Sequence, residues 1–242
     1  MSSALSSVGT PWNEGNADVC VVVPALNERS SVGRVVADLR EHFPNVICVD
    51  DGSTDDTADV ALAAGATVVR HPVNLGQGAA LQTGFAYALM RDDIAWVITF
   101  DSDGQHRVAD AMTLLATARE RDVDVVLGSR FLAGSAPIPR ARKWVLRAGV
   151  QFTRLTTRLP LTDTHNGLRV LGRRAVASMD LTLGDMAHAS QLLGLIARHE
   201  LSYVEAPVTI DYTAYSRARG QSNLNALNIA FDLAVERLRG RR

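Results

Sequence analysis

The sequence predicts an α/β fold in which a mostly parallel central sheet is flanked by helices. Three observations lead to this prediction. Short apolar runs such as VCVVVP (19–24) and AWVITF (95–100) recur along the first half of the chain. Segments with the apolar spacing of amphipathic helices separate these runs. Strands that are apolar on both faces are typical of parallel sheets covered by helices on both sides.

The first half of the chain alternates strands and helices in a regular order. Each expected strand is a short apolar run, and strands are expected at 19–24, 46–50, 67–70, 95–100 and 123–128. Each expected helix has apolar residues at helical spacing, and helices are expected at 31–42, 55–64, 77–90 and 108–121. This order predicts successive strand–helix–strand units in one sheet.

The second half is less regular. It opens with a long excursion at 131–165 that contains Gly134, Pro137, Pro139 and Pro160. A strand near 167–171, a helix at 188–198, a strand at 201–210 and a last amphipathic helix at 223–238 are expected after it.

We therefore expect one domain, preceded by a flexible tail that lacks the features of a secretory signal. The expected boundaries are a tail at 1–17 and a domain at 18–242, made of a regular half (18–130), an irregular half (131–222) and a C-terminal amphipathic helix (223–242).

Charge is distributed unevenly between the two halves, although the net charge is only -1. Residues 1–129 contain 8 Arg and 18 acids, a balance of -10, whereas residues 130–242 contain 17 Lys+Arg and 8 acids, a balance of +9. An acidic half suits a bound cation and a basic half suits an anionic partner such as a diphosphate or a charged membrane surface. A compositional bias towards Arg is the alternative, but it does not account for the concentration in one half.

The chain also indicates where the protein works. No apolar run reaches the ~18 residues of a membrane span. Cys20 and Cys48 both lie in apolar strand patterns, which suggests buried, reduced thiols in a cytoplasmic protein.

Polar clusters follow three of the expected strands. They are Pro24-Ala25-Leu26-Asn27-Glu28, Asp50-Asp51-Gly52-Ser53 and Asp101-Ser102-Asp103-Gly104-Gln105. Helix capping by Asn27, Ser30 or Ser53 is one explanation. Capping does not explain why two acids stand together in each of the last two clusters. Ligands bind beyond the carboxyl ends of strands in open parallel sheets, so the clusters favour a binding site.

Asp101 and Asp103 form the most informative of these pairs. Two residues along a strand advance ~6.6 Å and return to the same face, so both acids can face one centre. Mg²⁺ or Mn²⁺ prefers carboxylates together with substrate phosphate oxygens. Such an ion stabilises a departing diphosphate, which predicts cleavage of a nucleotide sugar.

Six motifs in this order resemble a known family. PALNE, DDGSTD, NLGQGAALQTG, DSDGQH, GSRF and DTHNGLR are similar to those of family-2 inverting glycosyltransferases with the GT-A fold. The likeness spans 19–222 and is greatest to the branch of dolichol- and polyprenol-phosphate mannosyl- and glucosyltransferases.

The resemblance implies roles for individual residues. It implies nucleotide-sugar binding by Pro24, Ala25, Asn27, Glu28, Asp50, Asp51, Gly76, Gly78, Asp101 and Ser102. It implies a metal site at Asp101, Asp103 and Gln105, and catalytic roles for Asp103, Arg130 and Asp185. It implies acceptor binding by Asp163, Gly167, Arg169, Arg217, Arg219 and Ser222. The sequence departs from the pattern at Gln77 and Asn223, where many relatives carry Lys.

The acceptor stays open between a phosphate and a hydroxyl. A hydroxyl acceptor needs a base, for which Asp185 is a candidate and His188 another, whereas a phosphate acceptor does not. The stretch 137–161 interleaves six basic residues with apolar ones and has no acid. This pattern is typical of a helix on an anionic membrane surface, or of a basic helix packed on the core or in a dimer.

These features favour a glycosyltransferase that moves a hexose from a UDP- or GDP-sugar to a polyprenyl-phosphate or other lipid-linked acceptor. We expect it to use Mg²⁺ or Mn²⁺ at the cytoplasmic face of the membrane, peripherally or with a membrane-protein partner, with a homodimer as an option and no nucleic-acid partner. The alternatives are a soluble transferase acting on a hydroxyl with Asp185 as base and a non-catalytic nucleotide-sugar-binding protein. A nucleotidyltransferase fits less well, because PALNE stands where its glycine-rich loop would follow the first strand. A dinucleotide-binding oxidoreductase also fits less well, because GQGAALQTG follows no clear strand–turn fingerprint and lacks a proper third Gly.

Overall fold

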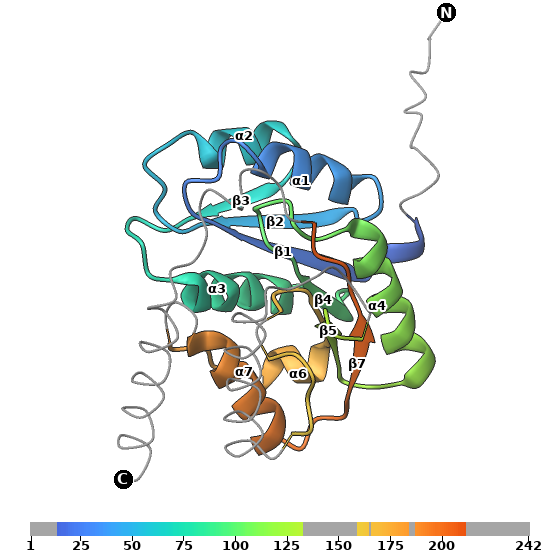
Figure 1. Ribbon diagram of the computed structural model, residues 1–242. Coiled ribbons are helices and arrows are strands. Elements are labelled where there is room, and N and C mark those ends of the chain that lie inside the picture. The colour runs from blue at the N-terminus through green and yellow to red at the C-terminus, as the bar shows by residue number, and fades with distance from the viewer. Residues whose placement is uncertain (1–13, 133–158, 165, 184–186, 212–242) are drawn as a thin grey trace, which may run out of the picture.

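A computed structural model describes residues 14–132, 159–164, 166–183 and 187–211. Its centre is a seven-stranded sheet with the strand order β3-β2-β1-β4-β6-β5-β7 (Figure 1). All pairings are parallel except those that β6 makes with β4 and β5. The strands are β1 (Val19–Ala25), β2 (Asn45–Asp50), β3 (Thr67–Arg70), β4 (Trp96–Thr99), β5 (Val125–Ser129), β6 (Arg169–Gly172) and β7 (Tyr203–Pro207).

Helices cover both faces of the sheet (Figure 1). One face carries α1 (Val32–Arg40), α2 (Thr57–Ala63) and α4 (Val108–Arg121). The other face carries α3 (Gln77–Leu89), α6 (Arg173–Ala177) and α7 (Ala187–Arg198). A short 3-10 helix, η1 (Glu14–Asn16), precedes β1, and Asn16 is buried there with its amide donating to the His42 carbonyl at 3.1 Å.

The apolar residues of β1 pack into two hydrophobic cores, one on each face of the sheet. Val19, Val21 and Val23 pack on the α1/α4 side, whereas Cys20 and Val22 pack on the α3 side. Helix α3 approaches this strand closely, since a Cβ atom at Gly84 would lie 2.2 Å from Val22 Cγ1. A strand covered on both faces therefore has no polar alternation, as the sequence indicated.

The elements expected from the sequence are confirmed within a few residues wherever the structure describes them. Helix α6 was not expected. The antiparallel direction of β6 was not expected either, although a mostly parallel sheet was. The expected helix at 223–238 lies outside the described residues, as does the stretch 137–161 except for its last three residues. Cys20 and Cys48 are buried free cysteines, and burial raises the pKa of each thiol to about 12.

The direction of β6 decides which residues meet at one edge. Arg169, at the start of β6, pairs with Thr99 of β4 and with Leu127 of β5. The residues just before β6 therefore lie beside those just after β4 and β5. The carboxyl ends of β1, β2, β4 and β5 and the amino end of β6 form one edge, which we call the site edge. Within the described part of the chain, no helix is both long and apolar enough to span a membrane.

Candidate active site

Strand order reverses between β1 and β4, because β2 and β3 lie on one side of β1 and β4 lies on the other. Open α/β sheets bind ligands at such a switch point. The hydroxyl of Ser102 spans it by donating to the Pro24 carbonyl at 2.9 Å. Ser102, Pro24 and Ala25 are all buried, so these three expected donor-site residues form the floor of the edge.

The loops after β1 and β2 are tied together by Asn27. Its backbone is in the left-handed region, with φ 55°, and its Oδ1 accepts the Thr54 amide N–H at 2.9 Å. The backbone N–H of Asn27 donates to Ser53 Oγ at 2.9 Å. Helix α1 has Ser31 as its N-cap residue, so the capping explanation is wrong for Asn27 and Ser30. Asn27 and Ser53 instead join two strand ends.

Glu28 is buried beside this junction, with 8% of its surface exposed. Its carboxylate accepts the Ser31 hydroxyl at 2.7 Å, and its backbone N–H donates to Thr57 Oγ1 at 2.8 Å. Its charge also acts on Asp103.

Asp51 organises the loop that precedes α3. Its Oδ1 accepts the Leu75 amide at 2.9 Å and lies 2.7 Å from His71 Nδ1, and its Oδ2 accepts the Gly76 amide at 2.8 Å. Gly76 has φ 94°, a conformation that glycine adopts without strain. Asp50 is buried and accepts the Ser53 amide at 3.1 Å, with Arg70 Nε at 3.4 Å. Both aspartates therefore shape the loops of the site edge.

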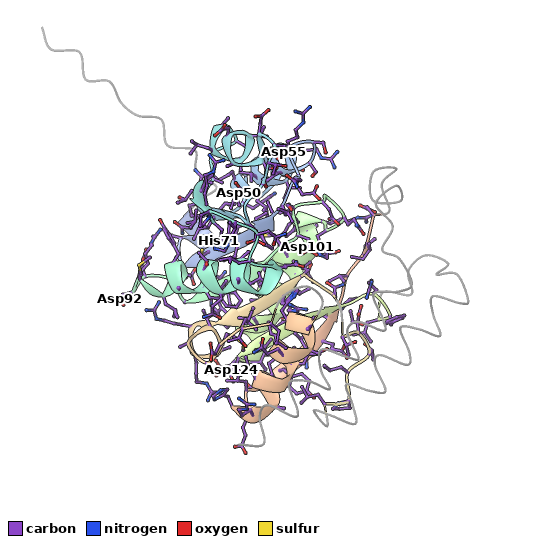
Figure 2. The ribbon with its side chains drawn as sticks, turned by 90° about the vertical axis from the view of Figure 1, so that its left-hand side faces the viewer. Asp50, Asp55, His71, Asp92, Asp101 and Asp124 are labelled. Carbon is purple, nitrogen blue, oxygen red and sulfur yellow. The ribbon has the colours of Figure 1, made fainter. Side chains whose placement is uncertain are left out.

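Asp101 lies at the centre of the site edge (Figure 2). Its Oδ1 accepts Gln77 Nε2 at 3.1 Å, and its Oδ2 lies 3.0 Å from His106 Nε2. A Cβ atom at Gly167 would lie 2.1 Å from Asp101 Oδ2, so this glycine makes room for the carboxylate. The Asp101 side chain remains 30% exposed, which leaves it accessible to a ligand.

The charge environment of Asp101 keeps it ionised. Burial raises the pKa of Asp101, but the hydrogen bond with His106 and the charges of His106 and Arg169 lower it by more. The pKa therefore lies below its usual value.

Asp103 is held differently. Its Oδ1 accepts the Gln105 amide N–H at 3.0 Å, and its Oδ2 accepts Gln105 Nε2 at 2.5 Å. Burial, followed by the charges of Asp101 and Glu28, raises the pKa of Asp103. The expected strand spacing of the two acids is wrong, because β4 ends at Thr99 and both acids lie in the turn that follows. They are nevertheless close enough to repel each other.

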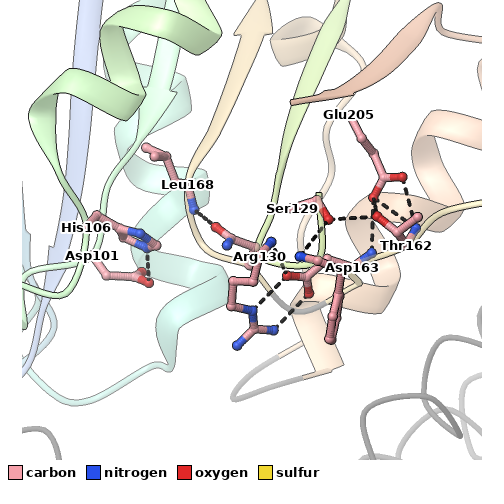
Figure 3. Close-up of polar contacts among 10 residues, drawn as sticks. Asp101, His106, Ser129, Arg130, Thr162, Asp163, Leu168 and Glu205 are labelled. Carbon is pink, nitrogen blue, oxygen red and sulfur yellow. Dashed lines mark hydrogen bonds and ion pairs between the residues drawn. The ribbon is translucent and has the colours of Figure 1, made fainter. Parts of the chain in front are cut away.

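Arg130 and Asp163 form a second group at the site edge (Figure 3). Asp163 accepts Arg130 Nε at 2.7 Å and Nη2 at 2.8 Å, so the pair is bidentate. The Asp163 side chain is 1% exposed and that of Arg130 is 14% exposed. Bidentate pairing fixes the plane of a guanidinium group. The structure thus joins two residues that the sequence analysis assigned to separate roles.

Arg169 lies inside the protein, with 3% of its surface exposed, where the charges of both Asp101 and Asp163 act on it. Burial lowers the pKa of its guanidinium, and the two aspartates counteract this. Three buried side-chain atoms in the described part of the chain have no hydrogen-bond partner, namely His106 Nδ1, Asn166 Nδ2 and Arg169 Nη1. All three residues flank Asp101 or Gly167.

The first turn of α3 is packed against the segment that leads into α7. A Cβ atom at Gly78 would lie 2.0 Å from the Leu183 carbonyl oxygen and 2.9 Å from His188 Cβ. The resemblance implied nucleotide-sugar binding at Gly78, but the groups that pack closely on this glycine are Leu183 and His188 of the protein itself. His188 is buried, and its charge acts on Asp101. Asp185, Arg217, Arg219 and Ser222 lie outside the described residues.

Several residues of the site edge were not identified from the sequence as site residues. Gln77 and His106 bind Asp101, and Asn166 precedes Gly167, which packs on Asp101. Thr162 and Glu205 hold the turn that carries Asp163. Gln77, His106 and Asn166 lie within the motifs NLGQGAALQTG, DSDGQH and DTHNGLR. Glu205 gave a signal of its own, because it is a lone acid in the apolar stretch LSYVEAPVTI and a carboxylate in such a stretch needs partners.

Preformed metal coordination is not seen among the residues that the structure describes, since no three His, Cys, Asp or Glu side chains converge there. The oxygen donors of Asp101, Asp103 and Gln105 are nevertheless of the type that Mg²⁺ and Mn²⁺ prefer.

A mostly parallel sheet with a switch point, an acidic turn beyond β4 and a bidentately held arginine at the same edge are typical of enzymes that bind nucleotide sugars. The profile of glycosyl transferase family 2 matches residues 20–179. The chain belongs to glycosyl transferase family 2.

Relatives of known function are similar along most of the chain. The UDP-N-acetylglucosamine–dolichyl-phosphate N-acetylglucosaminyltransferase of Methanococcus voltae is 29% identical over 241 residues, which cover 90% of this chain and 95% of the relative. The undecaprenyl-phosphate mannosyltransferase of Micrococcus luteus is 31% identical over 173 residues, which cover 67% of this chain and 70% of the relative.

Solved structures agree on the fold. Glucosyl-3-phosphoglycerate synthase from Mycobacterium tuberculosis in complex with UDP matches with a TM-score of 0.64 and 22% identity, covering 89% of this chain and 78% of that chain. The same enzyme with Mn²⁺, UDP-glucose and phosphoglyceric acid matches with a TM-score of 0.59 and 22% identity, covering 85% and 76%. The expected GT-A fold is confirmed.

Proposed function

We propose that this protein is a metal-dependent inverting glycosyltransferase that moves a hexose from a UDP- or GDP-sugar to a polyprenyl phosphate or another lipid-linked acceptor. The observation that carries the proposal is the acidic turn at the β1/β4 switch point, where Asp101 and Asp103 follow β4 and Ser102 contacts β1. Two relatives named for dolichyl-phosphate and undecaprenyl-phosphate support the class of acceptor. Such an acceptor would place the enzyme at the cytoplasmic membrane face.

The residues of the acidic turn fit a divalent cation. Burial and then the neighbouring charges of Asp101 and Glu28 raise the pKa of Asp103, so its ionised form would be favoured by a bound cation. Asp101, Asp103 and Gln105 would hold Mg²⁺ or Mn²⁺. When bound, the ion would neutralise the charge that develops on a departing nucleoside diphosphate.

Besides a bound metal ion, the side chain of Arg130 would bring positive charge to a phosphate in the site. Asp163 holds its guanidinium bidentately, so the side chain would meet a phosphate in a fixed orientation. We assign it to the donor diphosphate or to the acceptor phosphate. A phosphate acceptor is already an anion, so transfer to it needs no base.

A hydroxyl acceptor with Asp185 as base is the second candidate. The observation that favours it is the packing of Leu183 and His188 on Gly78, because these residues flank Asp185 and His188 acts on Asp101. Asp185→Asn separates the candidates. A loss of about 10²–10⁴-fold in turnover supports a hydroxyl acceptor and a base, whereas near-normal turnover supports a phosphate acceptor.

Donor binding and transfer test the proposal together. UDP-glucose, UDP-N-acetylglucosamine and GDP-mannose are each added without metal, with MnCl₂ and with MgCl₂, and thermal unfolding is followed. A donor at 100 times its dissociation constant stabilises the folded state by ~2.7 kcal/mol. The best donor, radiolabelled in the sugar, is then incubated with undecaprenyl phosphate in detergent, and sugar is expected in the lipid fraction. Stabilisation by no donor with either Mn²⁺ or Mg²⁺ would overturn the proposal.

A further inference from the structure

Glu205 of β7 has contacts that its place in an apolar strand does not predict. Both of its carboxylate oxygens accept the Thr162 amide N–H at 2.9 Å. Its Oε1 also accepts the Thr162 hydroxyl at 3.0 Å and the Asp163 amide N–H at 3.0 Å. One side chain thus holds the turn at 162–163, more than 40 residues away along the sequence.

The turn that Glu205 holds carries the partners of two site-edge residues. Asp163 accepts the backbone N–H of Arg130 at 3.1 Å in addition to the two guanidinium contacts. The Thr162 hydroxyl lies 2.7 Å from Ser129 Oγ, at the carboxyl end of β5. Figure 3 shows this series of contacts running from Glu205 through Thr162 and Asp163 to Arg130.

We propose that Glu205 is a positioning residue, which fixes Asp163 through the 162–163 turn and thereby fixes the guanidinium of Arg130 in the active site. This inference rests on the proposed function, in which Arg130 binds a phosphate. Glu205 itself touches neither reacting group.

A carboxylate is required at this position because every contact made to it is a hydrogen-bond donor. Ionised carboxylates accept through both oxygens and donate nothing. An amide of the same shape would direct an NH₂ group at the N–H groups of Thr162 or Asp163. Glu205→Gln therefore weakens the hold on the turn while preserving side-chain volume. The pairing of β7 with β5 is unaffected, since it uses the backbone of Glu205 opposite Leu127.

A double-mutant cycle tests whether Glu205 acts through Arg130. In the wild-type background, Glu205→Gln is expected to lower kcat/KM about 10–100-fold, the range for residues that support a contacting group. In the Arg130→Ala background, the same change is expected to cost nothing further. Equal losses in the two backgrounds would overturn the proposal, because Glu205 would then act independently of Arg130.

Asp124 provides a matched control. It is a carboxylate at the opposite edge of the sheet that accepts Arg174 Nε at 2.7 Å, the Ser202 amide at 2.8 Å and the Ser202 hydroxyl at 2.6 Å. Asp124→Asn breaks a comparable set of contacts away from the site. It is expected to lower the melting temperature and to leave kcat/KM unchanged, so a general effect of destabilisation is separated from positioning.

A readout without catalysis separates this inference from the proposed function. The Nε–H of Arg130 is hydrogen-bonded to Asp163 and is expected to give a slowly exchanging ¹H–¹⁵N resonance, assigned with Arg130→Lys. Glu205→Gln should broaden it or speed its exchange, and Asp124→Asn should not. If the wild type transfers no sugar but this pattern holds, the function fails and the positioning role stands.

An unchanged Arg130 resonance in folded Glu205→Gln would overturn the role. If Glu205→Gln does not fold, Thr162→Val removes only the hydroxyl contacts to Glu205 and Ser129, and the same cycle and resonance decide the question.

Discussion

The two edges of the sheet differ in the partners that most of their acids have. At the amino-terminal edge, which precedes β1, β4 and β5, four aspartates each face an arginine. The pairs are Asp18–Arg119, Asp92–Arg173, Asp93–Arg91 and Asp124–Arg174. At the site edge, Asp50 and Asp163 also face arginines. The remaining carboxylates are hydrogen-bonded by hydroxyl, amide and histidine groups, and they are those of Glu28, Asp51, Asp101 and Asp103. Figure 2 shows Asp92 and Asp124 apart from Asp101.

The difference appears in the pKa values. Hydrogen bonds from Arg174 and Ser202 outweigh burial and lower the pKa of Asp124 to about 2. Burial and neighbouring acids raise the pKa of Asp103. Arginine and serine therefore hold Asp124 as an anion at the amino-terminal edge, whereas the ionised form of Asp103 is disfavoured at the site edge and would be favoured by a bound cation.

The largest effect is expected from Asp103→Asn. We expect transfer to fall about 10²–10³-fold, as when one electrostatic contact at a reacting centre is removed. The melting temperature at pH 7 should stay the same or rise, because a carboxylate whose pKa is raised on folding costs stability when it is ionised. Activity assays and thermal unfolding measure the two outcomes. If Asp103→Asn kept more than a tenth of wild-type transfer, Asp103 would not have the role in transfer that sets the site edge apart from the amino-terminal edge.

Gly167→Ala should have the next largest effect. The added Cβ would lie 2.1 Å from Asp101 Oδ2, so the carboxylate or the backbone must shift. We expect a loss of about 1–3 kcal/mol in stability, together with a clear fall in transfer. Gly194→Ala is the control, since its Cβ would meet nothing within 4 Å in α7. That change should stabilise the protein by up to ~1 kcal/mol and leave transfer intact. Equal behaviour of the two variants would contradict the packing of Gly167 on Asp101.

Asp124→Asn sharpens the comparison through pH. A carboxylate with a lowered pKa contributes stability above its unfolded pKa of ~3.9, and this contribution is lost as pH falls towards about 2. We expect the variant to be less stable than the wild type by about 1–2 kcal/mol at pH 7, with the difference shrinking from pH 4 downwards. Urea unfolding between pH 7 and pH 3 measures it. A difference that grew on acidification would mean that Asp124 is not held as an anion.

Much of the fold was predictable because its signals are local. The apolar runs of β1, β2 and β4 and the helical spacing of α1 and α4 each reside in a few neighbouring residues, and these elements appeared where the sequence indicated. The acid pairs at 50–51 and 101–103 were likewise visible as consecutive polar residues after apolar runs. Their contacts were not, since Gln77 reaches Asp101 from 24 residues away and His71 reaches Asp51 from 20 residues away.

The sequence by itself determined the α/β class, the order of the strands and helices along the chain, and the motifs that mark glycosyl transferase family 2. Only the tertiary structure decided that β6 runs antiparallel between β4 and β5, which brings Gly167 against Asp101. It also decided that Glu205 holds the partner of Arg130. The physical reason is that periodicity and polarity act over a few residues, whereas strand register fixes contacts between residues that are far apart in the chain.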